Sequence, residues 1–200
     1  MFKVYGDVNS GNCYKVKLLL TQLQQPWQWI NINIIEQQTR TPEFLQKNPN
    51  GRIPVLEWEE GQFLWESNAI MYFLSENSEF FPNDRLKRAQ VFQWLFFEQY
   101  SHEPYIATSR YLIRYLNGAE KYRGILAEKR PLGYAALDVM EQHLTRHRFF
   151  VGDNYSIADI GLYAYTHVAE EGGFDLCGYP AILAWFGRIE SQPNYIKIGE

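Results

Sequence analysis

The spacing of hydrophobic residues changes twice near the start of the chain. An apolar run at 2–5 is typical of a short strand, and apolar residues at helical spacing over 16–23 predict a helix. The alternation of Ile30, Ile32 and Ile34 then predicts a second strand. The chain therefore begins as a βαβ unit.

A hairpin and two helices complete this first region. Two short runs with strand character, 55–59 and 62–65, are separated only by a Glu-Gly pair, which is typical of a tight hairpin. A short helix is predicted at 42–46, and another at 67–75. The predicted order is βαβαββα, and residues 1–76 are expected to form a small α/β domain.

The pattern becomes purely helical after a polar, proline-containing linker at 77–83. One helix is expected from Asp84 to Asn117 with a kink at Pro104, where the ring removes an amide donor. Another helix is expected from about Pro131 to His147. Residues 84–200 are therefore predicted to form an all-α domain.

A helix start is also predicted at the sequence Ser-Ile-Ala-Asp, residues 156–159. Ser156 can cap the amide of Asp159, while the Asp159 carboxylate reaches back to the Ser156 amide. Tyr155 and Ile160 occupy the flanking hydrophobic staple positions. We interpret this motif as a folding device and not as a reactive site.

Composition narrows the range of functions. The chain has 200 residues and a formal net charge of -4, and it lacks the clustered basic excess that nucleic-acid binding needs. No apolar run reaches the roughly 18 residues that span a bilayer, and no signal peptide is recognisable. With only two cysteines, 13 and 177, no disulfide framework is indicated. We expect a cytoplasmic protein that binds neither nucleic acid nor membrane.

Ser10 lies where the first strand passes into the first helix. The free amides and the positive end of the helix dipole favour an anion at such a place. Ser10 has no nucleophile-elbow sequence around it, so any chemical role would be that of a hydrogen-bond donor. An ordinary helix cap is the alternative interpretation.

A second candidate feature is the segment Asn-Pro-Asn-Gly-Arg-Ile-Pro at 48–54. A cis bond between Ile53 and Pro54 would leave the backbone groups of Ile53 available for strand-like hydrogen bonds with an extended peptide. A plain turn is the alternative.

The third candidate is Glu66-Ser67 at the start of the helix at 67–75. Ser67 and the first helical amides can bind a carboxylate, and Glu66 can bind an ammonium group. Together they suit the α-amino acid end of a ligand, although a capped helix beside a solvated charge would look the same.

Taken together, these motifs resemble the cytosolic glutathione S-transferase family. The resemblance rests on Ser-x-x-Cys at 10–13, Thr-Pro-Glu-Phe-Leu at 41–45, the 48–54 segment, Glu-Ser-Asn-Ala-Ile at 66–70 and the 156–159 box. It covers essentially the whole chain. The family implies a thioredoxin-like N-terminal domain, a helical C-terminal domain, usually a homodimer, and a function in detoxification.

The resemblance also implies roles for these residues. The γ-glutamyl end of glutathione would meet Glu66 and Ser67, and its cysteine backbone would pair with Ile53 beside Pro54. The thiol would lie near Ser10, which occupies the position of the serine used by theta- and delta-like members. Glutathione would be a co-substrate, and no metal is expected.

Two assignments stay open. Thr39 stands where many relatives place a histidine for the glycine carboxylate, so Gln38, Arg40 or Arg52 is available for that role. Asn12 is the second open assignment, because in some bacterial relatives a residue of this loop handles the thiolate in place of the serine. Ser10 and Asn12 are both candidates for the catalytic group.

Other reactive side chains are expected to be structural. Cys13 lacks the partner of a Cys-x-x-Cys pair and is predicted to be a small buried residue, and Cys177 falls in a loop. His143 and His147 share a helical face without a third ligand, so a metal site is not predicted.

The second substrate is expected to be small and hydrophobic or electrophilic. In this family the first long helix lines its pocket, which assigns His102, Tyr105 and Ser109 to that pocket by resemblance. The expected activity is transfer of glutathione to a soft electrophile. The alternatives are glutathione-dependent reduction of disulfides or peroxides, and a binding or scaffold protein without turnover.

Overall fold

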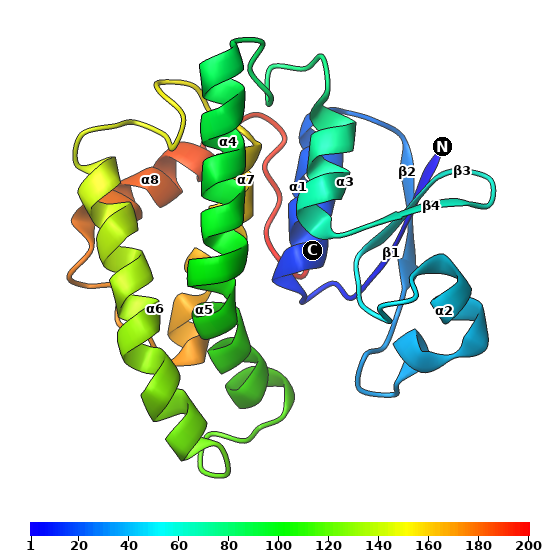
Figure 1. Cartoon of the computed structure of the whole chain (residues 1–200), viewed down its shortest axis with the longest axis horizontal. Coiled ribbons are helices and arrows are strands. Elements are labelled where there is room, and N and C mark those ends of the chain that lie inside the picture. Colours follow the sequence, from blue (N-terminus) through cyan, green and yellow to red (C-terminus); the bar gives the residue numbers. More distant parts are fainter. The chain divides into compact units, whose positions relative to one another are not determined.

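The computed structural model describes all residues, 1–200, and separates into two units (Figure 1). The first unit comprises Met1–Ser78 together with Gln192–Glu200, and the second comprises Glu79–Ser191. The division falls between Ser78 and Glu79, inside the segment that the sequence predicts as a linker. The last nine residues group with the N-terminal unit, whereas the sequence pattern assigned them to the helical domain.

The N-terminal unit has the predicted βαβαββα order. Its elements are β1 (Phe2–Gly6), α1 (Gly11–Gln22), β2 (Trp27–Asn31), α2 (Pro42–Lys47), β3 (Val55–Glu59), β4 (Gln62–Trp65) and α3 (Ser67–Ser75). The four strands form one mixed sheet in the order β2-β1-β3-β4. β1 pairs in parallel with β2 and antiparallel with β3, and β3 pairs antiparallel with β4.

The sheet is held by a core between its strands and the helices α1 and α3, which lie side by side (Figure 1). The core residues, all fully buried, are Val4, Val16, Leu20, Leu56 and Ile70. Burying each such side chain stabilises the fold by about 1.5–3 kcal/mol relative to exposure. This core fixes the strand ends from which the candidate site is built.

The second strand lies earlier in the sequence than the pattern predicted. β2 ends at Asn31, so the alternation through Ile32 and Ile34 falls mostly beyond it. The pairing partner explains the difference: β1 ends at Gly6, which lies opposite Asn31, and no strand remains to pair with later residues.

The second unit is entirely helical, as predicted. Its α-helices are α4 (Arg85–Phe97), α5 (Glu103–Arg110), α6 (Arg123–Leu144), α7 (Ile157–Thr166) and α8 (Pro180–Glu190). They pack around large apolar side chains that include Trp185, Tyr163 and Phe150. No helix of the protein is both long enough and apolar enough to cross a lipid bilayer.

The first predicted long helix is divided into segments. A π-helical segment, Glu98–His102, separates α4 from α5, and the amide of Glu103 bonds to the carbonyl of Glu98. The wider turn comes immediately before Pro104, which has no amide to donate. A second π-helical segment, Tyr111–Tyr115, replaces the expected α-helical end.

The second predicted helix has different limits. α6 begins at Arg123, eight residues before Pro131, which lies inside the helix, and it ends at Leu144. The sequence pattern predicts a later start, at about Pro131, and a later end, at His147. A proline inside a helix removes one backbone hydrogen bond, and here the helix continues through it.

Candidate functional site

Three chain segments meet at one edge of the sheet. Tyr5 lies opposite Val55 in the β1–β3 pair, and Val55 lies opposite Trp65 in the β3–β4 pair. Continuing these registers places the end of β1, the start of β3 and the end of β4 together. The loop that carries Ser10, the residues Ile53 and Pro54, and the start of α3 therefore share this edge.

Ser10 caps α1. Its Oγ accepts a hydrogen bond from the Cys13 amide at 3.4 Å, and its backbone has the extended conformation of an N-cap residue. A hydroxyl that accepts one bond still has a proton to donate. Ser10 is only partly buried, so the hydroxyl combines the cap that the sequence predicted with the capacity to bind an anion.

Asn12 and Ser67 are directly linked. The Ser67 hydroxyl donates to Asn12 Oδ1 at 3.1 Å, which joins the first turn of α1 to the first residue of α3. Ser67 is buried with 5% of its surface exposed. Two residues that the sequence assigned to different ends of a ligand thus lie in contact.

Glu66 has an unusual backbone. It precedes α3 with φ of 71° and ψ of 113°, in a region that non-glycine residues rarely adopt, and its side chain makes no cap hydrogen bond. Its carboxylate is exposed. Residues held in such conformations cost about 1–3 kcal/mol and cluster at ligand-binding sites.

The Ile53–Pro54 peptide bond is cis, which is one of the two alternatives that the sequence left open. Neither backbone polar group of Ile53 forms a hydrogen bond within the chain. The preceding turn is fixed by Asn48, whose Nδ2 donates to the Arg52 carbonyl at 2.7 Å. An unpaired amide and carbonyl beside a strand are suited to an extended peptide ligand.

The candidates for a second carboxylate differ in their surroundings. Thr39 is buried, and Arg40 donates to the Asn50 carbonyl at 3.2 Å beside Gly51. Gln38 accepts from the Asn33 amide. Arg52 is exposed, and its guanidinium forms no hydrogen bond or ion pair within the chain.

Lys15 was not identified from the sequence. It is fully buried in α1, and its Nζ lies 3.5 Å from Ser67 Oγ. A lysine is almost never fully buried without a partner for its charge. The available signal was its place on the same helical face as the buried Leu18 and Leu19.

The two cysteines are free, and Cys13 is buried as predicted. Burial raises the pKa of the Cys13 thiol to about 12, so this thiol stays protonated and unreactive at neutral pH. Cys177 is exposed in the loop before α8, and its hydrogen bond to Asp175 raises its pKa.

The residues assigned to an electrophile pocket belong to the helical unit. His102 is fully buried, with Nε2 2.9 Å from Thr166 Oγ1. Ser109 is buried and donates to the Tyr105 carbonyl at 2.6 Å. Of the three, only Tyr105 keeps part of its surface exposed.

The predicted capping box at the start of α7 is present. Asp159 is fully buried and accepts hydrogen bonds from the amides of Ser156 and Phe150, from the Ser156 hydroxyl and from Trp185 Nε1, at 3.0–3.1 Å. Burial raises its pKa to about 6, although these donors lower it. Asp159 is therefore a structural junction that joins α7, the preceding loop and α8.

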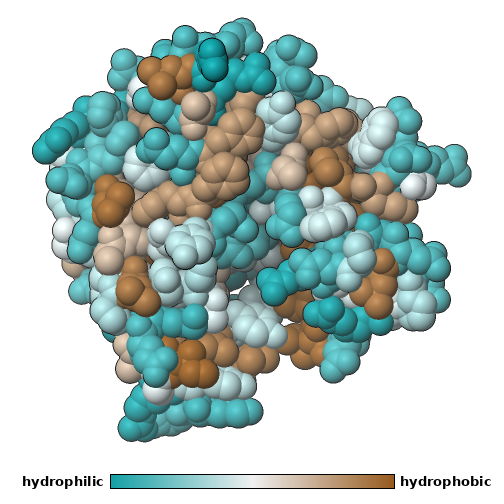
Figure 2. All heavy atoms as spheres, viewed as in Figure 1, coloured by the Kyte–Doolittle hydropathy of each residue, from teal (hydrophilic) through white to brown (hydrophobic).

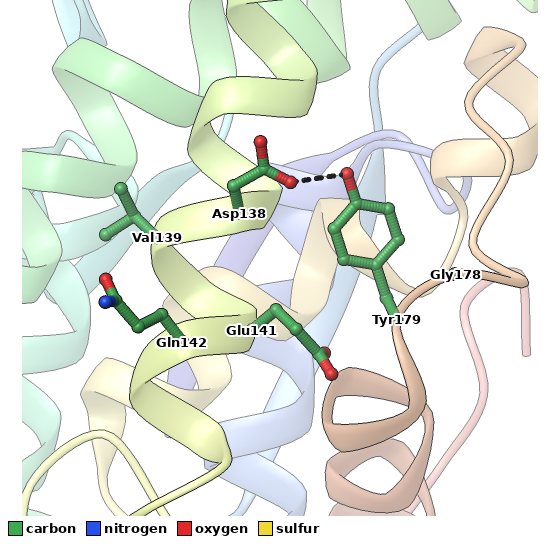
Figure 3. Close-up of a pocket in the computed structure, with 6 residues that line it drawn as sticks. All are labelled: Asp138, Val139, Glu141, Gln142, Gly178 and Tyr179. Atoms are coloured by element: carbon green, nitrogen blue, oxygen red, sulfur yellow. Dashed lines mark hydrogen bonds between the residues drawn. The ribbon is translucent and has the colours of Figure 1, made fainter.

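An open hollow on the helical unit is also structural (Figure 3). Figure 3 shows Asp138 and Glu141 extending from α6 toward Tyr179. Tyr179 donates to Asp138 at 2.8 Å, and Glu141 accepts the amides of Ala181 and Ile182 at the start of α8. The carboxylates of this hollow thus hold the end of a helix.

No group of three or more His, Cys, Asp or Glu side chains is arranged to hold a metal ion. His143 and His147 stack with ring centroids 4.4 Å apart, and His143 also packs against Trp94. Burial lowers the pKa of His143. This pair belongs to the aromatic packing of the helical unit.

Comparison with family models agrees with this architecture. The glutathione S-transferase N-terminal domain matches residues 9–77, and the glutathione S-transferase C-terminal domain matches residues 94–193. The crystal structure of a glutathione S-transferase from Pseudomonas fluorescens Pf-5 has a TM-score of 0.98 and 54% sequence identity. The match covers 100% of this chain and 99% of that one. This chain belongs to the glutathione S-transferase family.

More distant relatives have different descriptions. The disulfide-bond oxidoreductase YfcG of Escherichia coli K12 is 27% identical over 190 residues, covering 91% of this chain and 87% of YfcG. The transcriptional regulator URE2 of Saccharomyces cerevisiae is 25% identical over 236 residues, covering 98% of this chain and 67% of URE2. A structure of Ure2p in complex with glutathione shares the fold, with 23% identity and a TM-score of 0.88.

Proposed function

We propose that this protein binds glutathione and transfers it to a soft electrophile. The observation that carries the proposal is the unpaired backbone of Ile53, which shares the sheet edge with the start of α3 and with Ser10 at the start of α1. This arrangement offers one extended peptide a strand-like partner and two helix N-termini.

The γ-glutamyl end of glutathione is proposed to bind at the start of α3. Its α-carboxylate is received by the first backbone amides of the helix, including that of Ser67, and its ammonium group by the exposed Glu66 carboxylate. Both ends are charged, so each contact is a charge-assisted hydrogen bond. The unusual backbone of Glu66 supports a role in ligand binding.

The cysteine of glutathione is proposed to pair with Ile53, which directs its thiol toward Ser10 and Asn12. The glycine carboxylate then falls near the turn before Pro54, where Arg52 is the exposed cation without an internal partner. Arg40 is engaged with Asn50, so Arg52 is the better candidate for this carboxylate.

In the proposed reaction the bound thiol releases its proton to solvent. An electron pair of the thiolate sulfur then forms a carbon–sulfur bond with the electrophile, and a leaving group departs with the electron pair of the bond that breaks. Ser10 or Asn12 stabilises the thiolate by hydrogen bonding, and the protein supplies proximity. Lowering a thiol pKa by about two units corresponds to about 2.7 kcal/mol. The second substrate is proposed to be small and hydrophobic or electrophilic.

Disulfide reduction is the second candidate, and the similarity to YfcG favours it. In that reaction the glutathione thiolate attacks one sulfur of a disulfide, forms a mixed disulfide and releases the other sulfur as a thiolate. Peroxide reduction would use the same thiolate. A binding protein without turnover is the third candidate, because URE2 is described as a transcriptional regulator.

One assay series separates the three candidates. Wild type, Ser10→Ala and Asn12→Ala would be tested with an aryl halide, a hydroperoxide and a mixed disulfide, each with glutathione. The transferase proposal expects the aryl halide to be turned over and one of the two variants to slow it. If the disulfide or the hydroperoxide is turned over faster than the aryl halide, the protein is a reductase and the transferase proposal is wrong. If glutathione binds tightly but none of the three substrates is turned over, the binding protein without turnover is the remaining candidate.

A homodimer is also proposed. Both units expose large apolar side chains, among them Phe73 and Trp65 in the first unit and Phe96 and Tyr100 in the second. The last two are 68% and 84% exposed, and Figure 2 shows several apolar patches on a mostly hydrophilic face. Light scattering tests this: a mass near 23.6 kDa at micromolar concentration would contradict the dimer.

A cytoplasmic location is proposed on chemical grounds. Cys13 and Cys177 are both free thiols, which fits a reducing compartment. Glutathione is itself kept reduced in the cytosol. Fractionation of cells that express the protein would test this location.

A further inference from the structure

The buried Lys15 stands behind the proposed glutathione site. None of its surface is exposed, and its Nζ lies 3.5 Å from Ser67 Oγ. At this distance a hydrogen bond is weak, so the main effect of Lys15 on Ser67 is the electrostatic effect of its charge. A positive charge removed from water acts strongly on polar groups at this range, because little solvent screens it.

The contact between Ser67 and Asn12 fixes which group donates and which accepts along the three side chains. An ammonium group only donates hydrogen bonds, so Ser67 Oγ can only accept from Lys15. Ser67 has one proton of its own, and it donates this proton to Asn12 Oδ1 at 3.1 Å. The three side chains are therefore connected in one direction, from the Lys15 ammonium through the Ser67 hydroxyl to the Asn12 amide oxygen.

This chain determines which way the Asn12 amide faces. Only Oδ1 can accept the Ser67 proton, so Nδ2 and its two donors are on the opposite side of the amide group. A hydrogen bond headed by a cation also polarises the next bond in the chain. Asn12 Nδ2 consequently becomes a better donor to an anion.

We propose that Lys15 is a positioning residue for the glutathione thiolate, acting through Ser67 and Asn12. The inference rests on the proposed function, since it needs bound glutathione. It also divides the roles within Ser67: the hydroxyl orients Asn12, while the backbone amide serves the γ-glutamyl carboxylate. Lys15 itself does not contact the ligand, and its charge affects the thiolate only through these two side chains.

The test measures the pKa of the bound glutathione thiol from its ultraviolet thiolate absorbance. Lys15→Met removes the charge and keeps an apolar stem. Ser67→Ala breaks the chain at its next link and leaves the buried charge in place, so it provides an independent variant if Lys15→Met folds poorly. Lys17→Met is the matched control, because Lys17 lies on the same helix and contacts Trp27 and Trp29 instead.

We expect the bound thiol pKa to rise by about 0.5–1 unit in Lys15→Met and in Ser67→Ala, and to stay unchanged in Lys17→Met. The double variant should raise it no further than the larger single change, because both residues belong to one chain. Affinity for S-methylglutathione, which has no thiolate, should change by less than about threefold, since the ligand's other contacts remain.

The opposite result would overturn the inference. An unchanged thiol pKa in both variants, with equal loss of affinity for glutathione and S-methylglutathione, would assign Lys15 to the carboxylate site. Failure of the proposed function would give a different result, which is seen in the wild-type protein. The wild-type protein would then not bind glutathione, or it would bind glutathione and leave the thiol pKa at its value in solution.

Discussion

Two polar clusters, each at the start of a helix, differ in whether the protein's own groups satisfy their hydrogen-bonding atoms. At the start of α7, Asp159 receives four donors from the protein itself. At the start of α3, Glu66 makes no cap hydrogen bond, and the nearby Ile53 backbone is unpaired. The first cluster is saturated, whereas the second has capacity for a ligand.

The comparison shows why similar motifs serve different purposes. Both begin with a serine at the entry to a helix and have an acidic residue close by in the sequence, and both are buried in part. What distinguishes them is whether the protein's own groups satisfy the polar atoms. A closed cluster stabilises the fold, and an open one is available for binding.

Loss of the closed cluster should have the largest effect. Asp159→Ala leaves the Phe150 amide and Trp185 Nε1 buried without an acceptor, so the free energy of unfolding should fall by at least about 3 kcal/mol. Urea denaturation measures this. Asp153→Ala, at an exposed position six residues earlier, is the control and should change stability by less than about 0.5 kcal/mol. Equal effects in the two variants would mean that the cluster is not a structural junction.

The same cluster should produce a pH dependence. The pKa of Asp159 is raised to about 6 in the folded protein, while an unfolded chain has about 3.9. Between these values the folded protein holds a proton that the unfolded chain has lost. Stability from Asp159 is therefore full below about pH 4 and is lost as the pH rises through about 6.

This dependence is measured as the difference between wild type and Asp159→Asn, whose side chain does not titrate. The stability advantage of wild type should shrink between pH 4 and pH 7. An advantage that grows over this range would show that the ionised form of Asp159 is the one favoured by the fold.

The open cluster should respond in binding and not in stability. Glu66→Gln keeps the shape of the side chain and removes the charge that the ligand's ammonium group needs. Glutathione affinity should fall about 10- to 100-fold by calorimetry, with unchanged unfolding. Glu76→Gln, beyond the other end of α3, is the control. Unchanged affinity in Glu66→Gln would remove this residue from the site.

The smallest effect is expected at the edge of the open cluster. Arg52→Ala should weaken glutathione binding about three- to tenfold, since it removes one exposed charge contact. The loss should vanish with γ-glutamylcysteine, which lacks the glycine carboxylate. Arg40→Ala is the comparison, and a selective loss there instead would transfer the role to Arg40.

Local sequence patterns predicted much of this structure. The hairpin, α3 and the box at 156–159 each depend on residues close together in the sequence, and the structure has all three at the predicted positions. The cis bond before Pro54 was one of two alternatives that a proline between a turn and a strand left open. These features need no knowledge of distant contacts.

Features set by distant contacts were missed. Lys15 lies on an apolar helical face, but a lysine there usually extends its charge to solvent. In the structure Lys15 is fully buried instead, and its Nζ lies 3.5 Å from Ser67 Oγ. The C-terminal residues carry no local pattern either. They join the first unit because Tyr14 donates to the Ile196 carbonyl and the Gly199 amide to the Val8 carbonyl.

The most direct test of the open cluster is a pH titration of glutathione bound to the wild-type protein, followed by thiolate absorbance. Our account predicts a thiol pKa about two units below the roughly 8.5 of a free thiol, because Ser10 or Asn12 donates to the anion. A bound thiol that titrates near 8.5 or above would contradict the account, since the site would then hold glutathione without activating it.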